Sequence, residues 1–89
     1  MSVKTAKLIR QIRQAQQLGQ AILALTGLTN LNLVYAFATE TSLVINCRDY
    51  ASLWQLDDAH TQIRQAINRM GLGITNIWIE KEGQCAYDL

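Results

Sequence analysis

Apolar and polar residues follow two different periods along this chain, and each period predicts one kind of secondary structure. Between residues 3 and 26, apolar side chains recur every three or four positions, which predicts an amphipathic helix that Gly27 ends. Gly19 lies inside this helix, where glycine costs about 1 kcal/mol relative to alanine, so we expect a kink or a close helix contact there. The apolar positions are Leu8, Ile12, Ala15, Ile22 and Leu23.

Four other segments show the alternation that is typical of strands. Residues 31–38 and 43–48 alternate in this way, and a short polar turn joins them into a hairpin. A third strand is predicted at residues 74–80 and a short fourth strand at residues 84–88. Gly83 supplies the positive φ that the tight turn between them requires.

A second helix is predicted from residue 50 to residue 70, with Asp49 as its N-cap. Asp57 and Asp58 are unusual in the middle of a helix. They indicate an alternative, in which residues 51–56 form a short turn and the two carboxylates cap a helix that starts after them.

Two short motifs occur twice, and they divide the chain into similar halves. Residues 11–15 (QIRQA) return unchanged at 62–66, and GLTNL at 27–31 corresponds to GITNI at 73–77. Each half, about residues 3–48 and 50–89, therefore predicts a helix followed by a strand pair. The order αββαββ predicts an α+β fold with two helices on one face of a four-stranded sheet. This is a circularly permuted ferredoxin-like sandwich in one domain, residues 1–89, with its second and fourth strands as parallel neighbours, and it implies no function.

The repeat also assigns the two faces of the sheet. Leu31 and Leu33 correspond to Ile77 and Ile79, so these four side chains should point toward the helices, whereas Trp78 should point away. Monomers rarely leave a partly apolar face of this kind uncovered. The residues expected on the outer face are Val34, Ala36, Val44, Asn46, Asn76, Trp78 and Ala86.

Composition and charge limit the class of protein. Hydrophobic residues make up 49% of the 89 residues and charged residues 17%, which excludes a disordered chain. A chain this short buries only about 60% of its unfolded surface, so self-association would stabilise it. The apolar stretch at 21–25 is far shorter than the ~20 residues that span a bilayer, so we expect a soluble cytoplasmic protein.

The net charge of +1 conceals an uneven distribution. Residues 1–39 contain four basic and no acidic residues, whereas residues 40–89 contain four basic and seven acidic ones. Such a chain can pair head to tail or offer its basic end to an anionic partner. The four basic residues in the segment 1–39 are Lys4, Lys7, Arg10 and Arg13.

Candidate chemistry is sparse. Asp57 and His60 can meet at i, i+3 on a helix, which gives at most two ligands for a metal, and we interpret them as a solvated helix start. Cys47 and Cys85 both lie in predicted strands, and we interpret both as buried, unreactive thiols that are too far apart for a disulfide. We therefore predict no catalytic residue, no metal, no cofactor and no small-molecule substrate.

Nucleic acid is the alternative partner. Some sheets of this architecture stack RNA bases on two or three exposed aromatic residues. Because the repeat places Tyr35 and Phe37 in the core, only Trp78 remains for stacking. The basic residues of the first helix could still contact phosphates.

The leading hypothesis is a non-enzymatic protein–protein interaction module of the adaptor or regulatory-subunit type. It would form a homodimer through the outer sheet face around Trp78, a residue type that often anchors interfaces. The remaining interface residues in this hypothesis are Val34, Ala36, Val44 and Asn76.

Overall fold

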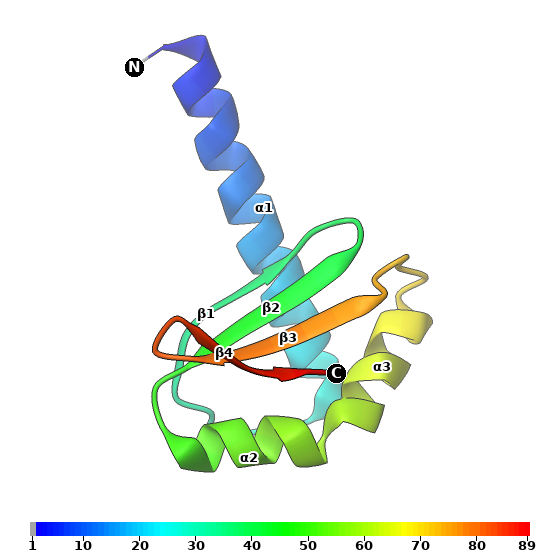
Figure 1. Cartoon of the computed structure of the whole chain (residues 1–89). Coiled ribbons are helices and arrows are strands. Elements are labelled where there is room, and N and C mark those ends of the chain that lie inside the picture. The colour runs from blue at the N-terminus through cyan, green and yellow to red at the C-terminus, as the bar shows by residue number, and fades with distance from the viewer. Residues whose placement is uncertain (1) are drawn as a thin grey trace.

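The computed structural model describes residues 2–89 as an α+β fold, with a four-stranded mixed sheet and helices packed against it (Figure 1). The elements are α1 (Val3–Thr26), β1 (Leu33–Ala38), β2 (Ser42–Cys47), α2 (Tyr50–Asp58), α3 (His60–Arg69), β3 (Asn76–Lys81) and β4 (Gln84–Asp88).

The first helix has the predicted bounds, and both of its ends have a local cause. The Ser2 side chain accepts a hydrogen bond from the Thr5 backbone N–H at the N-terminus. Gly27 adopts φ 73°, the left-handed conformation that ends the helix. The helix does not stop at Gly19, which is buried against β1. A Cβ at this position would lie 2.7 Å from the carbonyl carbon and oxygen of Ala36, so glycine allows α1 to touch the backbone of the sheet.

The predicted second helix is divided, so the order αββαββ is not confirmed. Residues 51–56 are helical within α2, and the division falls at Ala59, which has φ −96° and ψ 12°. The alternative with a capped restart is also wrong in detail, because no side chain caps the start of α3. The predicted cap at Asp49 is confirmed, since its carboxylate accepts a hydrogen bond from the Ser52 backbone N–H.

The order of the strands differs from the predicted permuted sandwich. The sheet order is β1-β2-β3-β4, and β2 pairs in parallel with β3 instead of with β4. The reason lies in the two sequences, because Ile77 and Ile79 of β3 are completely buried whereas most of β4 is exposed. A strand with a continuous apolar side belongs in the middle of a sheet. The repeated strands β1 and β3 therefore occupy different positions, one at the edge and one inside.

One hydrophobic core fills the space between the helices and one face of the sheet. It joins Ile22 and Ile63 of the helices to Leu43, Ile45 and the isoleucines of β3. Figure 1 shows α1 passing behind the sheet and extending well past the turn between β1 and β2, with α2 below the sheet and α3 to its right. None of the helices in residues 2–89 combines the length and apolarity that crossing a bilayer requires.

The contact between α1 and β1 yields a test. Alanine at position 19 gains about 1 kcal/mol in helix propensity, but its methyl group would overlap the Ala36 backbone, and overpacking costs about 1–3 kcal/mol. We expect Gly19→Ala to lower the Tm in thermal unfolding, whereas the exposed neighbour substitution Gln20→Ala should leave it unchanged or slightly raise it. An increase for Gly19→Ala would show that the close approach is not a constraint.

Candidate functional site

The open face of the sheet, opposite the helices, is the first candidate site. Its central feature is a row of three apolar side chains from neighbouring strands: Phe37 pairs with Val44, and Val44 pairs with Trp78. Residues paired across strands share a face of the sheet, so these three side chains lie together. Trp78 is 39% exposed and is among the large hydrophobic residues that remain open to solvent. We call Tyr35, Phe37, Val44 and Trp78 the aromatic face.

Two of these aromatic residues were expected in the core, and that expectation was wrong. The pairing of β1 with β2 shifts between Leu33 and Tyr35, which is the signature of a β-bulge at Val34. The extra residue reverses the alternation that follows it. Tyr35 and Phe37 therefore turn to the open face, and their rings meet edge to face at 5.0 Å between centroids.

The same bulge corrects the position of Ala36, which was expected on the outer face. It is only 1% exposed and pairs with the core residue Ile45 on the helix side. Of the other expected interface residues, Val44 and Trp78 belong to the aromatic face, and Asn76 is exposed at the start of β3. Val34 is 46% exposed at the bulge itself.

A second row of side chains crosses the open face beside the aromatic one. Tyr35 pairs with Asn46, and Asn46 pairs with Glu80. The Tyr35 hydroxyl donates a hydrogen bond to the Glu80 carboxylate and so spans the intervening strand. Asn46 is buried, and its Oδ1 accepts a hydrogen bond from the Gly83 N–H at 3.1 Å, which fixes the turn between β3 and β4.

The charged side chains on the open face are acidic. Glu80 lies in the second row, and Asp88 of β4 pairs with Trp78. Lys81 is the one basic residue in the four strands, and its Nζ lies 4.4 Å above the ring of Tyr50 in α2. Carboxylates repel phosphate, so this face disfavours nucleic acid despite its aromatic residues.

The projecting half of α1 is the second candidate site. None of its residues from Val3 to Leu18 is buried, and Leu8 and Ile12 are 56% and 42% exposed. Lys4, Lys7, Arg10 and Arg13 are all exposed there. At 100° per residue Lys7, Arg10 and Arg13 lie on the side of the helix away from Leu8 and Ile12, whereas Lys4 lies at the edge of the apolar side, one turn before Leu8.

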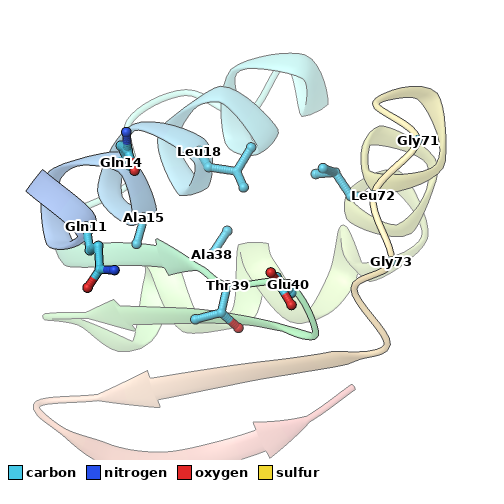
Figure 2. A pocket seen from close by; sticks show the side chains of 10 residues that line it. All are labelled: Gln11, Gln14, Ala15, Leu18, Ala38, Thr39, Glu40, Gly71, Leu72 and Gly73. Atoms are coloured by element: carbon cyan, nitrogen blue, oxygen red, sulfur yellow. The ribbon is translucent and has the colours of Figure 1, made fainter.

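A groove of about 630 Å³ lies between α1, the turn after β1 and the loop before β3 (Figure 2). Ala15, Leu18 and Leu72 give it an apolar lining, and Glu40 is its one charged residue. No histidine or cysteine lines the described groove.

The residues with possible metal or thiol chemistry are dispersed. His60 Nδ1 contacts the Asp57 backbone carbonyl oxygen at 3.0 Å, and the described residues contain no group of three or more metal-ligand side chains. Both cysteines are free. Burial raises the pKa of the Cys47 thiol, as expected for an inert cysteine, whereas Cys85 is exposed, contrary to prediction.

The sequence interpretation also missed an exposed aromatic pair on α2. The rings of Tyr50 and Trp54 stack at 6.0 Å between centroids, and each residue is 59% exposed. Their i, i+4 spacing is a signal that could have revealed the pair.

No family model matches the chain, and comparison with curated proteins and with solved structures finds no match. The inference of function therefore depends on the geometry and charge of these surfaces.

The link between Tyr35 and Glu80 can be tested by titration. The hydrogen bond to the Glu80 carboxylate, together with burial, raises the pKa of Tyr35 above 10.0. The contribution of this pKa shift to the free energy of unfolding is fully present below pH 10.0. It is lost as the pH rises through the pKa that Tyr35 has in the folded protein. In a Tyr50→Phe/Tyr87→Phe background, we expect Glu80→Gln to bring the spectrophotometric pKa of Tyr35 back toward 10.0. The control Glu82→Gln should not change it, and an unchanged pKa in Glu80→Gln would contradict the link.

Proposed function

We propose that this protein is a non-enzymatic protein–protein interaction module that forms a homodimer through the aromatic face. The observation that carries the proposal is the uncovered row Phe37, Val44 and Trp78 on adjacent strands. Tryptophan and tyrosine are the residue types that most often anchor protein interfaces. An adaptor or regulatory-subunit role fits a surface that offers aromatic and apolar side chains to a protein partner.

Rigidity supports a protein partner. The aromatic side chains stand on paired strands, and the edge-to-face contact between Tyr35 and Phe37 restricts both rings before any partner arrives. A preorganised surface loses less conformational entropy when it binds. The small size of the chain supports self-association, since a second copy would cover apolar area that one copy leaves in water.

Replacing the central anchor tests the proposal. We expect the wild-type protein to have twice the mass of the chain in multi-angle light scattering, and Trp78→Lys to have the mass of one chain. Trp54→Lys is the matched control, because Trp54 is exposed on α2 and lies outside the aromatic face. Circular dichroism would verify that both variants are folded. A folded Trp78→Lys protein that keeps the wild-type mass, or a monomeric wild type, would refute the dimer.

Nucleic-acid binding is the second candidate, and the basic side of α1 is the observation that favours it. Four exposed bases on a projecting helix without any acidic residue form a surface that phosphates would neutralise. The acidic open face argues against base stacking, so the contacts would be to the backbone of the nucleic acid and independent of sequence.

This second candidate predicts fluorescence anisotropy changes with single- or double-stranded probes that decrease steeply as salt rises. Arg10→Glu should weaken the binding several-fold at low salt. Arg69→Glu is the control, since Arg69 is an exposed base at the end of α3. Absence of binding at low salt would exclude this function.

A further inference from the structure

We infer that the projecting half of α1 from one copy lies across the aromatic face of a second copy, and that the two copies exchange these helices reciprocally. The inference rests on the proposed dimer and names the segment that covers its sheet face. Each copy has one uncovered sheet face and one uncovered helix, and the exchange covers both.

The first argument is that the projecting half of α1 lacks the support a helix needs. A helix of about 12–15 residues is only marginally stable in water without tertiary contacts. This segment has no acidic residue in its first turn, and Lys4 there opposes the positive end of the helix dipole. No described residue before Gly19 is buried. A surface that packs against the apolar side would stabilise the helix.

The second argument is the continuity of the apolar stripe. Leu8, Ile12, Ala15, Gly19 and Ile22 are spaced by four, three, four and three residues, so they lie along one side of α1. The C-terminal end of this stripe packs under the sheet of its own copy, where Gly19 and Ile22 are buried. The N-terminal end of the stripe therefore faces the same way. It faces the plane in which that sheet lies, at a position beyond the end of the strands.

A two-fold axis explains how a second sheet can meet this stripe. If the axis lies in the plane of the sheet, beyond the turn that joins β1 to β2, it places the second sheet end to end with the first and turns it over. The open face of the second copy then looks toward the projecting stripe of the first, and the reverse also holds. Such an interface is reciprocal, as is usual for dimers.

Length and charge are also compatible. At about 1.5 Å per residue, residues 3–14 extend about 18 Å, and a strand of 6 residues such as β3 extends about 20 Å. The open face offers the carboxylates of Glu80 and Asp88 but no base from its strands. Lys4 lies at the edge of the stripe, one turn before Leu8, and its long side chain can reach those carboxylates while Leu8 and Ile12 meet the aromatic face.

The role of the apolar stripe on α1 is tested first by measuring the mass of the protein in solution. Leu8→Lys/Ile12→Lys places two charges on the stripe and should reduce the mass in light scattering from two chains to one. Gln14→Lys/Gln17→Lys adds the same charge on the opposite side of α1 and should keep the dimer. If Trp78→Lys is monomeric but Leu8→Lys/Ile12→Lys remains a dimer, the sheet-face dimer stands and the helix exchange is refuted.

A second experiment identifies what the helix contacts. Ile12→Cys and Val44→Cys would be made separately in a Cys85→Ser background, mixed, and treated with a short thiol cross-linker. We expect a covalent pair that contains one chain of each variant. The Cys85→Ser protein alone should give no adduct, because its remaining thiol, Cys47, is buried. Cross-linking of Ile12→Cys to itself, without the mixed pair, would mean that two α1 helices meet along the groove and would overturn the inference.

Discussion

One-sided burial of the parallel pair β2 and β3 is the constraint on which the rest of the structure depends. Leu43 and Ile45 pair with Ile77 and Ile79, and all four are completely buried under the helices. Because successive side chains of a strand alternate between faces, each buried residue places its neighbour on the opposite side. Val44 and Trp78 are therefore on the open face as a direct result of core formation, before any partner is considered.

Features set by local sequence could be predicted, whereas those set by competition between segments could not. The bounds of α1 and the stop at Gly27 follow from periodicity and backbone freedom, and the outward position of Trp78 follows from alternation. The bulge at Val34 could not be read from the sequence, because leucine, valine and alanine fit either face of a strand at this position. That single residue decides whether Tyr35 and Phe37 are core residues or surface residues.

The internal repeat was a reliable guide to the type of each element and a poor guide to its place. It correctly predicted helical sequence followed by a strand pair in each half, but the second half has two helices, and the identical pentapeptides belong to a helix of 24 residues in one half and of 10 residues in the other. The strand β3, with Ile77 and Ile79 completely buried, lies inside the sheet, whereas its counterpart β1 lies at the edge. Similar local sequence therefore led to different tertiary positions, and the candidate surface depends on that difference.

The irregular pairing at both edges of the sheet limits how this protein can associate. A bulge interrupts β1 at one edge, and the pairing of β4 shifts by one residue at the other. Regular edges are templates on which further strands, and eventually fibrils, can grow, and bulges impede that growth. Irregular pairing at both edges therefore disfavours the joining of copies strand to strand into open-ended polymers.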